Sequence, residues 1–159
     1  MKKHQKGFSL IELLIVVAII LIIAAIAIPN LLRSRMAANE SSAVGSLRTI
    51  NTAEVTFATT YPAQGFAPNI GALGGPAPCT VAIVTAACLI DDVLSTQATK
   101  SGYTFTAVGA GALPMVTYTS TALPVIIGQS GQRAFCSDQS GVIRYNAGGA
   151  ACAPADPAL

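Results

Sequence analysis

The chain has 159 residues, of which 52% are hydrophobic and only 10% charged, and its formal net charge is +2. This length suits one globular domain with at most a short additional element. The composition excludes intrinsic disorder, which requires low hydrophobicity and high net charge. The small positive charge and an aromatic content of 6% give no support to a specific nucleic-acid groove.

The first predicted element is an apolar helix near the N-terminus. Residues 13–28 are all apolar, and the apolar segment extends back to Phe8 with only Ser9 and Glu12 interrupting it. A helix over residues 8–28 would be ~31 Å long, about the thickness of the hydrocarbon core of a bilayer. Three lysines precede it, and this basic excess favours a cytoplasmic N-terminus with everything after Pro29 exported.

Two simple interpretations of this segment are open. It is either a plain membrane anchor or an ordinary secretory signal peptide cleaved after Ala25-Ile26-Ala27. Glu12 is unexplained by both, because a carboxylate near the centre of a membrane helix costs roughly 2.5–3.5 kcal/mol. A position at headgroup depth would cost less, whereas a functional role would account for the carboxylate directly.

Residues 6–12 (KGFSLIE) closely resemble the processing motif of type IV pilins and type II secretion pseudopilins. The resemblance implies that a basic leader is cleaved between Gly7 and Phe8 and that the new N-terminal Phe8 is methylated. It also implies that Glu12 is the glutamate that directs assembly. Because glycine has no side chain, a peptidase at the membrane surface can approach the bond after Gly7 closely.

The sequence match to this family is close over residues 6–29. Beyond them, the chain resembles the family only in its general architecture. The close match includes Pro29, which corresponds to the proline partway along the family's N-terminal helix and is expected to kink that helix. Loss of the leader leaves six basic and seven acidic side chains and removes the single histidine, His4. The new amine of Phe8 can then pair with Glu12 of a neighbouring subunit, an interaction better suited to setting register than to adding stability.

The resemblance also implies partners and a location. The partners are further copies of the chain in a homopolymer, a prepilin peptidase/N-methyltransferase, an inner-membrane assembly platform, and membrane lipid before assembly. The unassembled subunit is expected to cross the inner membrane once, with its N-terminus cytoplasmic and its head periplasmic. The assembled filament is expected to be extracellular or periplasmic.

Four segments are predicted: a leader over 1–7, a transmembrane or filament-core helix over 8–29, an amphipathic continuation over 30–61, and a globular head over 62–159. The continuation ends at Tyr61 because the following proline disfavours helix. Its apolar residues lie within one arc of about 80° at helical spacing. They are Met36, Ala43, Leu47, Ile50, Phe57 and Tyr61.

Glu54 falls on the same arc as these apolar residues. The favoured interpretation is a residue at the edge of the apolar stripe, whose carboxylate extends to water. The alternative is a bond to an arginine or to a backbone amide of the head.

The expected fold class is α+β: the long N-terminal helix packs on a roughly four-stranded antiparallel sheet. Residues 62–100 are expected to be mostly loop, with a short element over 81–84 and a short helix over 89–98. Alternating patterns predict the sheet within 101–146. The strand candidates are 103–108, 115–119, 125–127, 133–137 and 142–145, with a hairpin turn over 138–141. A disulfide-closed C-terminal loop over 136–159 completes the head.

Four cysteines lie beyond the membrane segment, at positions 79, 88, 136 and 152. An even number in an exported region predicts two disulfides, for which three connectivities are possible. Local closure favours Cys79–Cys88 and Cys136–Cys152, and the second pair also resembles the disulfide loop of many pilins. Zinc binding is the competing interpretation, but the spacings are not those of a C-x-x-C site, so no metal site is predicted. A calcium site at Asp138 or Asp156 has no support from ligand spacing.

No catalytic site is predicted. The only histidine, His4, lies in the predicted leader, which excludes a Ser-His or Cys-His nucleophile from the processed chain. Lys100-Ser101 is best interpreted as part of a solvated loop. The sequence has no phosphate loop or dinucleotide fingerprint, and no cofactor is expected.

The hypothesis is a structural subunit of a type IV pilus. Two predicted disulfides and the closed C-terminal loop favour a pilus over the alternative within the family, the major pseudopilin of a type II secretion system. The alternative of another class is a secreted monomeric binding domain with an ordinary signal peptide.

Overall fold

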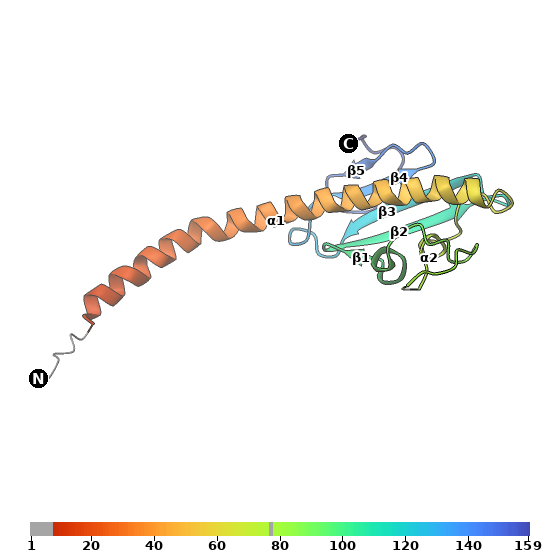
Figure 1. The fold of residues 1–159 in the computed structure, drawn as a ribbon. Helices are drawn as coiled ribbons and strands as arrows, with labels where there is room; N and C mark the ends of the chain where they lie inside the picture. The colour runs from red at the N-terminus through yellow and green to blue at the C-terminus, as the bar shows by residue number, and fades with distance from the viewer. Residues whose placement is uncertain (1–7, 77) are drawn as a thin grey trace, which may run out of the picture. The chain divides into compact units, whose positions relative to one another are not determined.

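The computed structural model describes residues 8–76 and 78–159 (Figure 1). Gly7 and the rest of the predicted leader lie outside these residues. The chain divides into two compact units, one ending at Arg35 and one running from Met36 to Leu159. The second unit, called the head below, contains the sheet and both disulfides.

Helix α1 (Leu10–Thr60) belongs to both units. It ends directly before Tyr61-Pro62, as the sequence predicts, because proline restricts the residue before it to extended backbone. Within the head, one face of α1 is buried and the opposite face is exposed. The buried residues are Glu40, Ala43, Val44, Ser46, Leu47, Ile50, Ala53, Glu54 and Phe57. Met36 and Tyr61, at the two ends of the predicted stripe, are half-buried.

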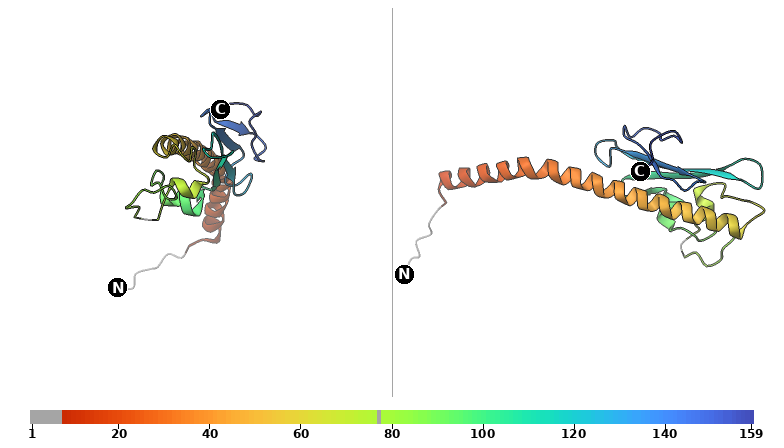
Figure 2. Two further views of the ribbon diagram at one scale, coloured as in Figure 1. Left: turned by 90° about the vertical axis from the view of Figure 1, so that its right-hand side faces the viewer. Right: turned by 90° about the horizontal axis from the view of Figure 1, so that it is seen from above.

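The sheet is antiparallel and its strands follow chain order, β1-β2-β3-β4-β5. The strands are β1 (Thr99–Lys100), β2 (Tyr103–Ala110), β3 (Thr117–Pro124), β4 (Ala134–Asp138) and β5 (Arg144–Asn146). The head part of α1 crosses one face of this sheet (Figures 1 and 2). The predicted α+β class and antiparallel sheet are confirmed, with five strands in place of about four.

Alternation of side chains along β2 explains why the sheet has one buried face. Tyr103, Phe105 and Ala107 point into the core, whereas Thr104 and Thr106 are exposed. This is the period of two expected for a strand with one solvated face. Threonine therefore supplies the outer face without adding charge, which accounts for much of the low charge content.

Two predicted strand positions were wrong. Residues 125–127 form no strand, because the ladder between β2 and β3 ends at Pro124 and the next residues enter a turn closed by Ser130. Strand β3 also begins at Thr117, two residues later than predicted. The two-residue strand β1 was not predicted, since so short a segment shows no alternation.

The region between α1 and the sheet contains more local structure than predicted. A short helix, α2 (Ile70–Leu73), begins at Asn69, whose side chain accepts a hydrogen bond of 3.1 Å from the backbone of Ala72. The predicted helix over 89–98 is observed as the π-helical turn η1 (Val93–Gln97), preceded by a hydrogen bond from Leu94 N to Asp91 Oδ1. Residues 81–84 contribute only the isolated bridge between Ile83 and Ala86.

Two disulfides join Cys79 to Cys88 and Cys136 to Cys152. The second joins β4 to the C-terminal segment and closes the expected C-terminal loop. That segment also pairs with β5 through hydrogen bonds from Tyr145 N to Pro157 O and from Leu159 N to Ile143 O.

Candidate functional site

The first candidate site is the apolar part of α1. Its large side chains from Leu10 to Ile28 are 45–72% exposed. Within the described residues, α1 is the one helix long and apolar enough to cross a membrane, with a window of mean hydropathy 3.3 of which none is buried. A signal sequence would pass the same test, so length and composition alone do not distinguish an anchor from a signal. The unit ending at Arg35 therefore presents an apolar surface that water solvates poorly.

Glu12 caps its own helix in the single chain. Its Oε2 atom accepts a hydrogen bond of 2.9 Å from the backbone N–H of Ser9, and Leu13 N donates to Ser9 O at 3.2 Å. Ser9 precedes the first helical residue and Glu12 is the third, so the two occupy the end positions of an S-x-x-E capping box. The sequence pattern carried this signal, but it was interpreted only as part of the processing motif.

Pro29 lies inside α1, and the helix continues through it. Because proline has no backbone N–H, the carbonyl four residues earlier lacks its helical donor. The kink expected at Pro29 stays a prediction.

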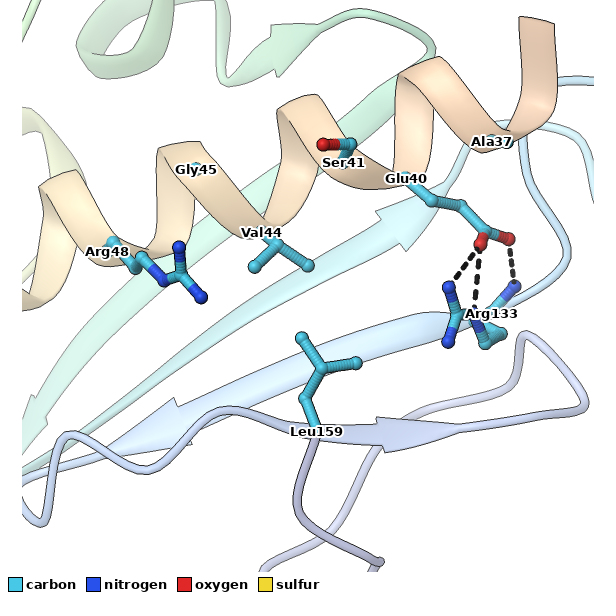
Figure 3. Close-up of a pocket in the computed structure, with 8 residues that line it drawn as sticks. All are labelled: Ala37, Glu40, Ser41, Val44, Gly45, Arg48, Arg133 and Leu159. Atoms are coloured by element: carbon cyan, nitrogen blue, oxygen red, sulfur yellow. Dashed lines mark hydrogen bonds and ion pairs between the residues drawn. The ribbon is translucent and has the colours of Figure 1, made fainter. Parts of the chain in front are cut away.

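Glu40 and Arg133 form the main charged cluster of the head (Figure 3). Glu40 Oε1 accepts hydrogen bonds from the backbone N–H groups of Gln132 at 2.9 Å and Arg133 at 3.0 Å. Glu40 Oε2 accepts one from Arg133 Nε at 2.9 Å and lies 2.8 Å from Arg133 Nη2. Burial raises the pKa of Glu40, but these backbone and side-chain donors outweigh it, so the pKa lies below its ordinary value. The carboxylate therefore stays ionised and fastens α1 to the start of β4.

Arg133 also lies over two aromatic rings. Its guanidinium carbon is 5.4 Å from the ring centre of Phe135 and 5.5 Å from that of Tyr145. Both distances are within the range of cation–π attraction. The cluster is thus a structural joint between the helix, β4 and β5.

The groove beside this joint has a volume of about 540 Å³. Helix α1 supplies one wall and the C-terminal residue Leu159 lies opposite (Figure 3). The lining residues are Ala37, Glu40, Ser41, Val44, Gly45, Arg48, Arg133 and Leu159. Since both oxygens of Glu40 are engaged by Gln132 and Arg133, the side-chain carboxylate in the groove is not free for acid–base chemistry.

Glu54 is fully buried, so the favoured interpretation of a carboxylate extending to water was wrong. Its Oε2 atom accepts a hydrogen bond of 2.8 Å from the backbone N–H of Ala67, and Oε1 has no partner. The alternative, a bond to a backbone amide of the head, is the observed arrangement. Burial raises the pKa of Glu54 to about 7, against the lowering effect of the Ala67 hydrogen bond.

The described residues contain no group of three or more His, Cys, Asp or Glu side chains that could hold a metal ion. Asp138 and Asp156 are engaged in local turns. Asp138 Oδ1 accepts from Ser140 N at 2.8 Å, and Asp156 Oδ2 accepts from Ala153 N at 2.8 Å.

Comparison with known families adds a specific match for the N-terminal segment. Residues 2–28 match the family model of the prokaryotic N-terminal methylation motif. The chain is 62% identical over 39 residues to the type IV wide pilus major component PilA4 of Thermus thermophilus, covering 24% of this chain and 30% of the relative. It is 48% identical over 54 residues to the type IV major pilin protein PilA of Myxococcus xanthus, covering 34% of this chain and 24% of the relative.

A third relative, the type IV major fimbrial protein FimA of Dichelobacter nodosus, is 54% identical over 52 residues, or 31% of this chain and 33% of the relative. The matches thus span about a quarter to a third of the relatives' length. No solved structure matches the chain significantly. The resemblance to the type IV pilin superfamily is confirmed: the methylation motif matches residues 2–28, and the relatives are named as a pilus component and a pilin.

Proposed function

We propose that this protein is the structural subunit of a type IV pilus and polymerises through its N-terminal helix into a helical surface filament. One observation carries the proposal: the exposed apolar helix over residues 13–28 lies within the match to the N-terminal methylation motif, which covers residues 2–28. Exposing a whole apolar helix to water is unfavourable, so lipid or further copies of the chain must cover it.

In the proposed pathway, a prepilin peptidase/N-methyltransferase cleaves between Gly7 and Phe8 and methylates the new N-terminus. Before assembly, residues 8–29 cross the inner membrane with the N-terminus cytoplasmic and the head periplasmic. An inner-membrane assembly platform then moves the subunit into the filament. There the apolar helices bury against one another, while the helix continuation over residues 30–61 and the globular part over residues 62–159 make the outer surface. A head-to-tail contact that does not close into a ring produces such a filament.

Glu12 is proposed to pair with the amine of Phe8 on a neighbouring subunit. Its Oε2 atom already accepts from Ser9 N within its own chain, which leaves the other carboxylate oxygen for a second donor. In a dry helix bundle, leaving one partner of such a pair unmatched costs about 3–5 kcal/mol, so the pair selects one register of packing.

The head supports a structural role over a catalytic one. The carboxylates of its two buried glutamates are engaged in holding elements together, Glu40 at Gln132 and Arg133 and Glu54 at Ala67. We propose that the subunit is not an enzyme and needs no cofactor.

The decisive experiment is mass spectrometry of the mature N-terminus. A chain that begins with N-methylated Phe8 supports the proposal. A chain that begins at Ile28 would show cleavage by ordinary signal peptidase and would replace the filament subunit with a secreted domain. Electron microscopy of surface fibres then separates a pilus from a type II secretion pseudopilus, which stays in the periplasm.

A further inference from the structure

The loop between β3 and β4 holds three adjacent apolar side chains in solvent. Val125 is 54% exposed, and Ile126 and Ile127 are each 52% exposed. Single exposed apolar residues are common on soluble proteins, but three consecutive branched aliphatic residues on one turn form a local apolar surface.

Hydrogen bonds within the loop fix it in this form. The Ser130 Oγ atom accepts from Ile126 N at 3.0 Å, and Ser130 N donates to Ile126 O at 3.0 Å. Val125 N donates to Gly102 O at 3.0 Å, which anchors the start of the loop to the turn between β1 and β2. The loop therefore cannot turn its aliphatic side chains inward without breaking this network.

The loop is also fastened to the first turns of α1 in the head. Asn39 Nδ2 donates to Ser130 O at 2.8 Å, and Gln132 N donates to Glu40 Oε1 at 2.9 Å. The head begins at Met36, so these bonds place the loop beside the first turns of the head's own part of α1.

Chain length limits how far this end of the head can lie from a membrane. Residues 29–35 separate the apolar segment from Met36 and are helical, which corresponds to ~10 Å of helix. The polar headgroup layer extends roughly 5–8 Å beyond the hydrocarbon core on each side. If residues 8–29 span a bilayer, only the short connection ending at Arg35 leads to Met36, so the turns of α1 that hold the loop are within reach of the bilayer surface.

Charge in this region matches a lipid surface. Residues 125–133 contain no acidic side chain, and the carboxylate nearest to the loop, Glu40, is paired with Arg133. The connecting residues include Arg33 and Arg35, which are exposed and can reach lipid phosphates. Exposed apolar side chains combined with basic residues are typical of proteins that bind at the membrane interface.

We propose that Val125, Ile126 and Ile127 insert into the interfacial layer of the bilayer while the subunit is anchored, as a second membrane contact besides the N-terminal helix. This inference rests on the proposed membrane-spanning role of residues 8–29. The contact holds the head against the membrane before assembly and is released when the subunit enters a filament. A second copy of the chain is the competing occupant, and the experiment distinguishes it.

The test places a nitroxide spin label on the full chain, with its disulfides intact, in vesicles of phosphatidylethanolamine and phosphatidylglycerol. The variant Ile126→Cys carries the label in the loop. The variant Val116→Cys is the matched control, because Val116 is 70% exposed and lies at the opposite end of β3. We expect the label at position 126 to be several-fold less accessible than the label at 116 to a water-soluble nickel chelate, and more accessible to oxygen.

Equal nickel accessibility at positions 126 and 116 overturns the inference. Protection at position 126 that occurs only in assembled filaments also overturns it, in favour of a second copy of the chain. A third variant, Ile20→Cys, keeps the inference separate from the proposed function. If the label at 20 is protected by lipid and the label at 126 is not, the loop contact alone fails; if the label at 20 is also exposed to nickel, the membrane-spanning role fails.

Discussion

The Oε2 atom of Glu54 accepts a hydrogen bond of 2.8 Å from the backbone N–H of Ala67 inside the core of the head. The two residues are 13 positions apart, one on α1 and one in the segment that follows the helix. The bond holds this segment against the helix and satisfies a buried backbone donor. It also places an ionisable group where water does not reach, since Glu54 is 0% exposed.

We expect the stability of the head to fall as pH rises from about 4.5 to about 7. The folded pKa of Glu54 is raised to about 7 from 4.5, so between these values the folded state binds more protons than the unfolded state. Stability contributed by the protonated carboxyl is therefore complete below pH 4.5 and is lost toward pH 7, by on the order of 3 kcal/mol. Urea unfolding in detergent solution, followed by the near-ultraviolet circular dichroism of the buried tyrosines, measures this slope.

The matched variant for this prediction is Glu54→Gln, which keeps an acceptor for Ala67 N and cannot ionise. Its free energy of unfolding should lack the decrease between pH 4.5 and 7. The neighbouring Tyr118 does not contribute, because burial and the charges of Glu54 and Asp138 raise its pKa to about 12. An identical slope in the wild type and the variant would contradict the role of Glu54.

Glu40→Ala should destabilise the head more than Glu40→Gln. The alanine variant leaves the backbone N–H groups of Gln132 and Arg133 without an acceptor, at a cost of about 1–3 kcal/mol each if they stay buried. The glutamine variant retains an acceptor oxygen and loses mainly the charge. Urea unfolding at pH 7 ranks the two, and the prediction is wrong if the variants are equally stable.

Two glycine substitutions should change stability in opposite directions. A Cβ atom at Gly131 would overlap the hydroxyl oxygen of Tyr103, which donates a hydrogen bond of 2.7 Å to Arg133 O. Gly131→Ala must displace that buried ring, and we expect a loss of about 1–3 kcal/mol. A Cβ at Gly45, inside α1, meets no atom within 4 Å, so Gly45→Ala should stabilise the helix by roughly 0.5–1 kcal/mol. Thermal unfolding of both variants beside the wild type tests the pair, and a shift in the same direction would contradict it.

Replacing Cys136 and Cys152 together by serine should lower the stability of the head by ~3 kcal/mol in the chain-entropy description of a loop of this length. The C-terminal segment would then be held mainly by hydrogen bonds such as Tyr145 N to Pro157 O. We expect hydrogen exchange at Tyr145 and Leu159 to increase while α1 stays protected. The double serine variant of Cys79 and Cys88 is the control, since that disulfide lies outside the sheet and its loss should leave exchange at Tyr145 and Leu159 unchanged.

Glu12→Ala is expected to leave folding and leader cleavage intact and to prevent efficient filament assembly. The observed hydrogen bond from Ser9 N to Glu12 calls for a second variant, Glu12→Gln, which preserves the helix cap and removes the charge. If charge pairing with Phe8 of a neighbouring subunit directs assembly, both variants should yield few filaments by electron microscopy and sedimentation. A normal filament yield from Glu12→Ala would exclude the assembly role, and a normal yield from Glu12→Gln alone would assign that role to the cap.

Local patterns in the sequence were sufficient for several features of this protein. The continuous apolar run over residues 13–28 and the break at Tyr61-Pro62 predicted the extent of α1, because hydropathy and proline sterics act over a few residues. Alternation predicted most of β2 and β4 for the same reason, but only residues 117–119 of β3. Cys136 and Cys152 could be paired from their separation in the sequence, because a disulfide between them closes a short loop.

The tertiary structure decided the features that depend on contacts between distant segments. The stripe position of Glu54 was visible in the sequence, but its burial was not, because only the folded head shows that Ala67 N lies within reach of the carboxylate. Likewise, no pattern connects Glu40 with Arg133, which lie 93 residues apart. Short elements such as β1 and the turn over 125–127 also depend on contacts with neighbouring segments, because two or three residues are too few to show a periodic hydrophobic pattern.

The sequence by itself therefore determined the apolar helix, the match to the N-terminal methylation motif and the α+β class, all of which depend on interactions between residues a few positions apart. Only the tertiary structure decided which carboxylates join α1 to the rest of the head and that the apolar residues 125–127 remain exposed. The physical reason is that burial and hydrogen-bond partners depend on packing between segments. Packing brings together residues that are far apart in the chain, and such contacts produce no recognisable pattern in the sequence.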